Sequence, residues 1–311
     1  MIKVVAFHQN QLGDLLFSLP ALKAIRDQRQ EVVISSVVRP YLSELLKETS
    51  LVDEIIIREK GAGLFDRLRL ISQLRQQRFE MGLFFSCSEG SLILGYLGGI
   101  KERIGFMGRS DFLLTKKIAK KGTSSTLNCL RLVEEMGIRP QKRDYVGLVK
   151  IPSSDMEFAR RLLKEEKIAV ISPFASKRRK NKEWPKERWA KALDLLWTKK
   201  HLRSLIVGTR EEIGQAEKIK ELARVAKPQV LAGETTILQL GALIKLSKIF
   251  IGIDSGPTHL ASSLKVPVVA LFGPTDPSCV GPEADNSLVI KKEEIGLIEA
   301  EEVMARAEEI S

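Results

Sequence analysis

The chain has 311 residues, of which 44% are hydrophobic and 29% charged, and its excess of Lys and Arg gives a formal net charge of +11. This length predicts two domains, and the composition excludes disordered, collagen-like and disulfide-stapled proteins. The three cysteines, Cys87, Cys129 and Cys279, lie far apart without the spacing of a zinc site, which favours a reducing, intracellular compartment.

In residues 1–150, short apolar runs alternate with segments of helical periodicity. The apolar runs predict strands at Ile2–Phe7, Glu31–Val38, Leu51–Ile57 and Met81–Phe85. The segments between them predict helices at Pro20–Gln30, Tyr41–Glu48 and Leu64–Gln77. Repeated strand–helix alternation is typical of a doubly wound parallel sheet, so we expect a Rossmann-like first domain.

The alternation starts afresh after the charged, proline-containing stretch 139–154. Strands are predicted at Ile168–Ser172, Ser204–Val207, Ile249–Ile253 and Val266–Phe272, and helices at Lys186–Lys199, Glu211–Arg224, Thr258–Leu264 and Ala300–Ile310. The expected fold class is α/β, with two Rossmann-like doubly wound parallel-sheet domains at 1–150 and 151–311. We expect them to face a cleft at the carboxyl ends of their strands, where such sheets bind ligands.

Positive charge is concentrated in the first half of the chain. Residues 1–150 contain 24 Lys and Arg against 16 Asp and Glu, whereas residues 151–311 contain 26 against 23. Residues 101–150 alone hold 12 against 5, and their cations include Arg103, Lys116, Lys117, Lys120 and Lys121. Such a basic patch concentrates an anionic partner, whether nucleic acid, anionic lipid or a phosphorylated substrate, but it is equally compatible with a solvated face.

The first predicted strand runs into Gly13 and Asp14. Gly13 permits a tight turn or a close backbone approach. Asp14 has two interpretations: a helix N-cap that contributes about 1 kcal/mol of stability, or a general base that takes the proton of an acceptor hydroxyl. The segment lacks the G-x-G-x-x-G fingerprint, which disfavours an NAD- or FAD-dependent dehydrogenase.

A cationic loop follows the strand Ile168–Ser172. Six of the eight residues 176–183 are Lys, Arg or Ser, among them Ser176 and Lys182. A basic loop between a strand end and a helix start suits phosphate binding, because lysine supplies charge while hydroxyl and backbone N–H groups supply directed hydrogen bonds. The alternative is a solvent-exposed basic loop, with Trp184 and Trp189 packing the next helix.

The strand Ile249–Ile253 ends in Asp254, Ser255 and Gly256, and a helix of small residues follows at once. Ser255, Gly256 and the first N–H groups of that helix predict an anion cradle for a diphosphate. His259 lies one turn beyond Ser255, where it serves either as a donor to a phosphate or sugar oxygen or as a structural hydrogen bonder. No dedicated metal cage is predicted, since Asp254 and Asp276 lack the nearby carboxylates or histidines that a magnesium or zinc cage requires, and no cofactor is expected.

Together these clusters resemble the ADP-heptose:lipopolysaccharide heptosyltransferase family, which has the two-domain GT-B glycosyltransferase fold. The matching segments are Leu12-Gly13-Asp14 with Pro20-Ala21-Leu22, Lys182-Glu183-Trp184-Pro185 with Trp189, and Asp254-Ser255-Gly256-Pro257-Thr258-His259 with Phe272-Gly273-Pro274-Thr275-Asp276-Pro277. Arg103-Ile104-Gly105-Phe106 is similar to the family's first-domain pattern. The family often has a histidine before Leu130, where this chain has Ser124-Ser125-Thr126.

The resemblance implies inverting transfer of a heptose from ADP-heptose to the lipopolysaccharide inner core, on a lipid A–Kdo or heptosyl acceptor. Asp14 would be the general base, with Gly13 and the basic patch on the side of the anionic acceptor. Lys182 would neutralise the pyrophosphate, with Ser176 near it. Asp254, Ser255, Gly256 and His259 would hold the donor sugar and diphosphate, and Glu212, or its neighbour Glu211, would contact the ribose.

A lipid-linked acceptor implies a cytoplasmic, peripheral enzyme on the inner face of the inner membrane. The chain has no apolar run of membrane-spanning length and no signal-peptide pattern at its start, so we expect neither secretion nor spanning. Another nucleotide-sugar-dependent transferase of the cell envelope is the nearest alternative, and a catalytically idle sugar-nucleotide binder is a further one. A basic nucleic-acid-binding protein is disfavoured, because only 6% of residues are aromatic and no recognition motif is present.

Overall fold

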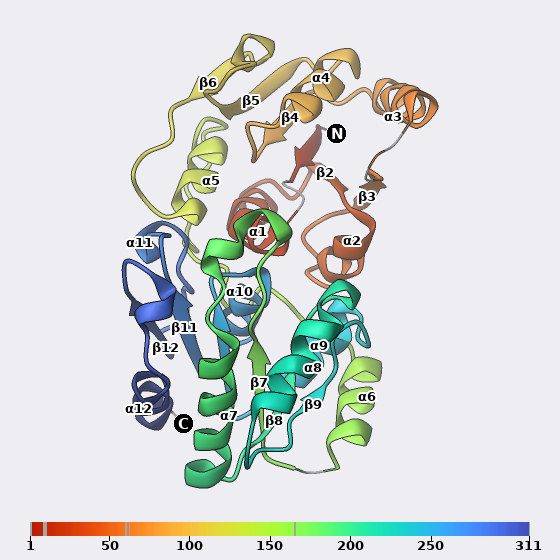
Figure 1. Cartoon of the computed structure of the whole chain (residues 1–311). Coiled ribbons are helices and arrows are strands. Elements are labelled where there is room, and N and C mark those ends of the chain that lie inside the picture. The colour runs from red at the N-terminus through yellow and green to blue at the C-terminus, as the bar shows by residue number, and fades with distance from the viewer. Residues whose placement is uncertain (1, 9–10, 60, 62, 165, 311) are drawn as a thin grey trace. The chain divides into compact units, whose positions relative to one another are not determined.

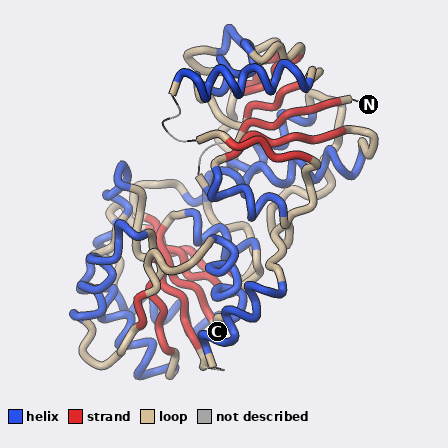
Figure 2. The backbone as a smooth tube through the Cα atoms, turned by 90° about the vertical axis from the view of Figure 1, so that its right-hand side faces the viewer, coloured by secondary structure: helices blue, strands red, loops and turns tan. Residues whose placement is uncertain are grey.

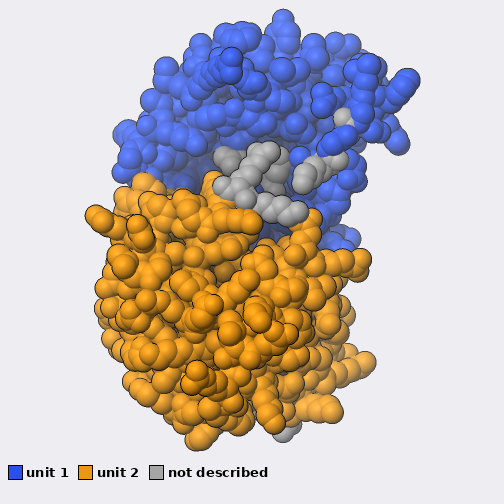
Figure 3. Space-filling model, in the orientation of Figure 1, with its two compact units in different colours: residues 1–148 blue, residues 149–311 orange. Residues whose placement is uncertain are grey.

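The computed structural model describes residues 2–8, 11–59, 61, 63–164 and 166–310. The chain divides into two units, Met1–Leu148 and Val149–Ser311 (Figure 3). The division falls within the charged stretch 139–154 that separates the two predicted series of strands and helices.

Unit 1 is built on a parallel sheet of six strands. They are β1 (Lys3–Phe7), β2 (Val33–Val38), β3 (Glu54–Ile57), β4 (Met81–Phe84), β5 (Glu102–Phe106) and β6 (Lys116–Ile118). Their order across the sheet is β3-β2-β1-β4-β5-β6. The register of the central pair sets Phe7 opposite Phe84, whose rings stack at 4.6 Å between centroids and help fill the core on one face of the sheet.

The helices of unit 1 cover the two faces of this sheet (Figure 1 and Figure 2). They are α1 (Leu12–Gln28), α2 (Pro40–Lys47), α3 (Leu64–Gln77), α4 (Glu89–Leu97) and α5 (Ser125–Glu134), with the short 3₁₀ turn η1 (Asp111–Leu113). Helix α1 packs against α5, and α3 packs against α4. Among the helices and strands of unit 1, the sequence patterns do not predict α4, α5, β5 or β6.

Helix α1 begins at Leu12, so the predicted start at Pro20 is wrong. A proline inside a helix removes one backbone hydrogen bond and normally interrupts the helix. Here twelve of the 17 residues of α1 are buried, and this tertiary packing stabilises the helix across Pro20. The N-cap position belongs to Gln11, and Asp14 lies in the first turn. The interpretation of Asp14 as the N-cap is therefore also wrong.

Unit 2 repeats the architecture with a second parallel sheet of six strands. They are β7 (Ile168–Ser172), β8 (Arg203–Ile206), β9 (Gln229–Val230), β10 (Ile249–Ile253), β11 (Val268–Phe272) and β12 (Ser287–Lys291). Their order is β12-β11-β10-β7-β8-β9, which is the order of unit 1 with each strand replaced by its counterpart. The predicted α/β fold class with two doubly wound parallel sheets is confirmed.

The helices of unit 2 are α6 (Ser153–Leu163), α7 (Lys186–Lys200), α8 (Ile213–Leu222), α9 (Ile237–Leu246), α10 (Gly256–Ser263), α11 (Pro277–Val280) and α12 (Ala300–Ile310), with 3₁₀ turns η2 (Lys177–Lys182), η3 (Arg210–Glu212) and η4 (Ile295–Leu297). The predicted helix at Glu211–Arg224 is thus shorter, with a 3₁₀ turn before it. The C-terminal helix α12 lies against α7. Just before it, the carbonyl of Ile298 accepts hydrogen bonds from Trp184 Nε1 (2.9 Å) and from Arg188 (2.7 Å).

Both strand orders reverse direction at one point, between β1 and β4 in unit 1 and between β7 and β10 in unit 2. At such a switch point the loops leaving the two central strands diverge to opposite faces, and ligands bind in the space between them. Asp14 follows β1, Lys182 follows β7 and Asp254 follows β10, so each unit carries predicted site residues at its switch point. None of the helices in the described residues is long and apolar enough to cross a membrane.

Candidate active site

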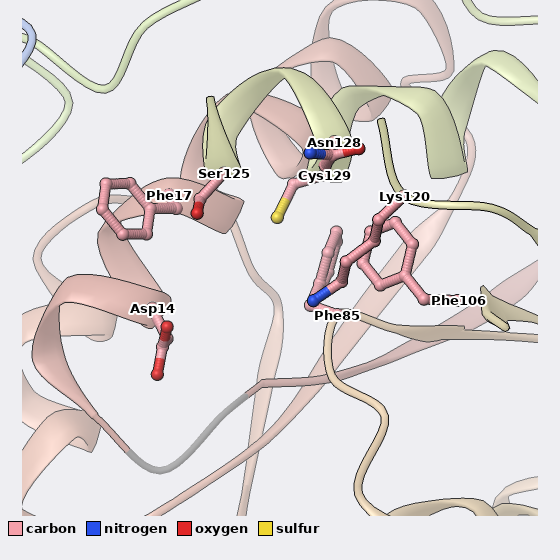
Figure 4. Close-up of a pocket in the computed structure, with 8 residues that line it drawn as sticks. All are labelled: Asp14, Phe17, Phe85, Phe106, Lys120, Ser125, Asn128 and Cys129. Atoms are coloured by element: carbon pink, nitrogen blue, oxygen red, sulfur yellow. The ribbon is translucent and has the colours of Figure 1, made fainter. Parts of the chain in front are cut away.

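A recess lies beside Asp14 at the switch point of unit 1. Eight residues line it, and Figure 4 shows them: Asp14, Phe17, Phe85, Phe106, Lys120, Ser125, Asn128 and Cys129. They come from α1, from the ends of β4 and β5, from the segment after β6, and from α5. The recess has a volume of about 50 Å³. It can therefore take a hydroxyl-sized group but does not enclose a sugar.

The lining of this recess combines polar side chains with three phenylalanine rings. In Figure 4 the hydroxyl of Ser125, the thiol of Cys129 and the amine of Lys120 point into the space between α1 and α5, with Asp14 at one side. The ammonium of Lys120 lies 4.9 Å from the ring centroid of Phe106, which is a cation–π contact. Asp14 lies in the first turn of α1, where the helix dipole favours a negative charge. The lining of the recess thus includes one carboxylate and one cation.

The cations of the basic patch have separate surroundings. Arg103 donates to the carbonyl of Leu113 through Nε (2.6 Å), and Lys117 pairs with Asp111 at 3.0 Å. Lys116 and Lys117 are neighbours on β6, so their side chains leave opposite faces of the sheet. Lys116 donates to the Glu135 carbonyl (3.3 Å), whereas Lys121 is exposed. Lys116 and Lys117 therefore do not share one face of the sheet, and Lys120 is the member of the patch that lines the recess.

His8 ends β1 as a buried residue, 4% exposed. Its Nδ1 lies 2.7 Å from the hydroxyl of Ser18 and its Nε2 lies 3.1 Å from that of Ser36. Because the Ser18 hydroxyl donates to the Leu15 carbonyl, Nδ1 carries the hydrogen and Nε2 accepts from Ser36. Burial lowers the pKa of His8 to about 3, so the ring is neutral. This ring, stacked on Phe85, ties α1 to the sheet beneath the recess.

In unit 2 the fold brings together three of the residues predicted to bind the sugar-nucleotide donor. The Nζ of Lys182, at the end of η2, makes an ion pair with Oδ2 of Asp254 at the end of β10. The second oxygen of Asp254 lies 4.0 Å from Nε2 of His259 on α10. All three side chains are less than a tenth exposed. A buried cation and anion have lost their water, so each depends on the other for compensation.

His259 is neutral in this cluster. Burial lowers its pKa to about 4, and the effect outweighs the opposing attraction of Asp254, while the charge of Lys182 acts in the same direction as burial. A neutral imidazole has one nitrogen that donates and one that accepts. Such a group can hold a sugar hydroxyl or a phosphate oxygen without adding a second positive charge next to Lys182.

The start of α10 lies directly after Asp254. Ser255 occupies the N-cap position in extended conformation, but its side chain makes no capping hydrogen bond. Its Oγ is buried and, among the described residues, has no hydrogen-bond partner. Gly256 opens the helix and its N–H lies at the positive end of the helix dipole, whereas Pro257 has no N–H and the Thr258 N–H donates to the Ser255 carbonyl at 3.2 Å. The predicted anion cradle of Ser255 and Gly256 therefore stands beside the Lys182–Asp254 pair.

Two further residues predicted to bind the sugar-nucleotide donor make hydrogen bonds within their own 3₁₀ turns. Ser176 is exposed at the N-cap position of η2, and its carbonyl accepts from the Arg179 N–H (2.7 Å). Glu212 belongs to the capping box of η3, in which its Oε2 accepts from the N–H of Thr209 (2.6 Å). Both residues lie at the carboxyl edge of the sheet, after β7 and β8. Their contacts to a donor stay predictions.

Residues 67–305 match the profile of glycosyltransferase family 9 (heptosyltransferase). The chain belongs to glycosyltransferase family 9. The resemblance predicted from the sequence motifs is thereby confirmed, and with it the assignment of the chain as a glycosyltransferase.

Individual relatives and solved structures that resemble this family 9 glycosyltransferase are also heptosyltransferases. Lipopolysaccharide heptosyltransferase 3 of Escherichia coli (strain K12) is 26% identical over 284 residues, covering 85% of this chain and 80% of that protein. The structure of E. coli ADP-heptose lps heptosyltransferase II matches with a TM-score of 0.86 at 20% identity, over 99% of this chain and 98% of that one. E. coli heptosyltransferase WaaC with ADP-2-deoxy-2-fluoro heptose matches with a TM-score of 0.78 at 19% identity, over 100% of both chains. At these identities the solved structures establish the common fold.

Sequence reasoning missed most of the lining of the recess in this glycosyltransferase. Phe17, Asn128 and Cys129 come from helices whose extents were not predicted. Phe85 and Phe106 could have been found, because each lies at or just after the end of a strand. No group of three or more His, Cys, Asp or Glu that could hold a metal ion occurs in the described residues.

Proposed function

We propose that this family 9 glycosyltransferase transfers a heptose from ADP-heptose to the lipopolysaccharide inner core, with inversion at the anomeric carbon. Support comes from relatives named as lipopolysaccharide heptosyltransferases and from a structural neighbour bound to an ADP-heptose analogue. The observation that carries the proposal is the buried cluster of Lys182, Asp254 and His259 at the start of α10. A cation, a helix N-terminus and a neutral imidazole suit the diphosphate and sugar of such a donor.

On the donor side, Lys182 and the N–H of Gly256 at the positive end of α10 would meet the negative charge that builds on the departing ADP. Asp254 positions Lys182 for this role, because the ion pair holds the ammonium at the end of the sheet where α10 begins. Ser255 and His259 would bind oxygen atoms of the diphosphate or the sugar. Glu212, with Ser176 on the neighbouring loop, completes the proposed donor set at the ribose and pyrophosphate.

On the acceptor side, Asp14 would take the proton of the attacking hydroxyl. The hydroxyl oxygen forms a bond to the anomeric carbon on the face opposite the diphosphate, and the bond from that carbon to the diphosphate oxygen breaks as ADP leaves. The proton remains on Asp14. Lys120, which lines the same recess, would bind an anionic group of the lipopolysaccharide precursor.

The acceptor of this reaction is anchored in a bilayer. We therefore propose that the enzyme works as a peripheral protein at the cytoplasmic face of the inner membrane. Lys and Arg side chains near an anionic surface each contribute about 1 kcal/mol to such an association.

A transfer assay with ADP-heptose and a panel of truncated lipopolysaccharide cores tests the proposed reaction directly. Asp14→Asn should lower transfer by at least about a hundredfold, the range of general-base catalysis, and leave ADP binding close to that of the parent. Asp27→Asn is the matched control, since Asp27 lies on the same helix and pairs with Lys23 at the surface. Normal turnover by Asp14→Asn would exclude the residue as the base.

The identity of the donor needs a separate measurement. ADP-heptose and UDP-sugars should be compared as competitors for the purified protein. Displacement by ADP-heptose at far lower concentration supports the proposal, whereas preferential displacement by a UDP-sugar would assign the chain to another envelope glycosyltransferase.

A further inference from the structure

Exposed apolar side chains gather in one part of unit 1. Of the fifteen exposed large apolar residues among the described residues, eight fall between positions 64 and 112. They are Leu64, Phe65, Leu68, Ile93, Tyr96, Leu97, Met107 and Phe112. They belong to α3, to α4 and to the segment around η1. A soluble protein scatters such side chains singly, so a concentration of them marks an interaction surface.

Helix α3 carries the most exposed members. Its inner face is formed by Leu70 and Leu74, which are buried in the core of unit 1. Leu64, Phe65 and Leu68 are 71%, 87% and 52% exposed. At about 100° per residue these three span an arc of about 100°, centred on the side of the helix away from Leu70 and Leu74. The helix therefore has a second apolar stripe that contributes nothing to the core.

The charges around this stripe are positive. Arg67 and Arg69 are exposed on its two borders, and Arg75 continues it toward the C-terminus of α3. Asp66 is the sole acidic residue of the helix, and its carboxylate accepts the Gly63 N–H at 3.1 Å, where it caps the helix. An exposed apolar stripe bordered by arginines is typical of helices that lie in the interface of an anionic bilayer.

The surface continues from α3 to α4. Arg75 Nε donates to the Leu97 carbonyl at 2.7 Å and joins the two helices, which lie side by side at the margin of unit 1 (Figure 1). On α4, Ile93, Tyr96 and Leu97 form one exposed stripe. The guanidinium of Arg103 lies 5.5 Å from the ring centroid of Tyr96. Arginine beside an exposed aromatic ring repeats the pairing of cation and apolar side chain seen on α3.

The position of this surface within unit 1 suits a membrane-anchored acceptor. In a parallel sheet each crossover helix begins at the carboxyl edge of the strands. The first turn of α3, with Leu64 and Phe65, therefore lies at the same edge of the sheet as Asp14 and the recess.

We propose that the exposed stripe of α3, continued by α4, docks this enzyme on the surface of an anionic lipid bilayer. The apolar side chains of Leu64, Phe65 and Leu68 enter the boundary between headgroups and acyl chains, and Arg67 and Arg69 bind the lipid phosphates. Charge favours this occupant over a second copy of the chain, because a symmetric pairing would set arginines against arginines. The inference rests on the surface itself and stands whichever sugar the enzyme transfers.

Vesicle flotation of the full chain tests the proposal. Phosphatidylcholine vesicles with and without phosphatidylglycerol are compared, at low and at high salt. The parent should float with the anionic vesicles and less so at high salt. The variant Leu64→Ser/Phe65→Ser/Leu68→Ser should bind at least about tenfold more weakly, because three partly inserted apolar side chains are removed. Arg67→Gln/Arg69→Gln should lose mainly the preference for anionic vesicles.

The matched control is Ile213→Ser/Val225→Ser/Leu297→Ser, which removes three exposed apolar residues of unit 2 and should bind like the parent. Equal flotation of the α3 variant and the parent would overturn the proposal. So would absence of binding by the parent, or an oligomer of the parent that dissociates in the α3 variant, which would assign the stripe to a second copy. Transfer to a soluble, delipidated acceptor should be the same in the α3 variant and the parent. If neither transfers, the proposed reaction fails while the flotation result still decides the docking surface.

Discussion

The buried ion pair of unit 2 gives the sharpest test of the physical reasoning. Lys182 and Asp254 are 8% and 9% exposed, and they lie 72 positions apart in the sequence. Replacing Asp254 by Asn keeps the size of the side chain and removes its charge. The ammonium of Lys182 is then buried without a compensating negative charge. Breaking a buried pair in this way costs about 3–5 kcal/mol of unfolding free energy.

We expect the lower part of the range, about 3 kcal/mol, because the Asn carbonyl still accepts a hydrogen bond from Lys182. The double variant Lys182→Met/Asp254→Asn should recover most of the loss, since replacing both charges is often neutral or stabilising.

Denaturation by urea, followed by tryptophan fluorescence, measures these changes in one unit. All three tryptophans, Trp184, Trp189 and Trp197, belong to unit 2, so the signal reports that unit alone. The control is the exposed pair of Lys199 and Glu308, where Glu308→Gln should change stability by about 0.5 kcal/mol or less. A loss below about 1 kcal/mol in Asp254→Asn, or additive losses in the double variant, would refute the reasoning.

The remaining predictions concern both units. Gly233→Ala should destabilise unit 2 by about 2 kcal/mol in the same urea assay, because φ is +75° and the new Cβ would lie 2.8 Å from Cα of Arg210. Asp194→Ala should cost about 2 kcal/mol there, since its carboxylate accepts three backbone N–H groups at 224–226, and should leave turnover unchanged. Unit 2 should lose stability as the pH falls from about 6.5 toward 4, because unfolded His259 binds a proton that the folded residue, with its pKa of about 4, does not. His259→Gln should flatten that dependence in urea titrations across the pH range, and an unchanged slope would contradict it. His8, with its pKa of about 3, should act likewise in unit 1. Its replacement should flatten the acid-side fall of the circular-dichroism transition, which includes both units, and leave the tryptophan transition of unit 2 unchanged.

Much of the fold follows from local patterns in the chain. The apolar runs predicted β1, β7, β10 and β11 to within a few residues, because strands buried on both faces are continuous segments rich in Val and Ile. The strands β5 and β6 were missed, since their charged and glycine residues break that pattern. The start of α1 was also misplaced, because only burial in the assembled unit stabilises a helix through Pro20.

The candidate site divides in the same way. Sequence alone placed Asp14, Lys182, Asp254 and His259 in the segments that follow strands, since a strand ends where its apolar run does. It could not show that Lys182 pairs with Asp254, because strand order brings β7 beside β10 and is set by long-range pairing. Nor could it show that Lys116 and Lys117 leave opposite faces of the sheet, which depends on the pairing of β6 with β5. Local periodicity depends only on residues that are close in the sequence. Burial, ion pairing and the lowered pKa of His259 arise only when segments distant in the sequence pack together and exclude water.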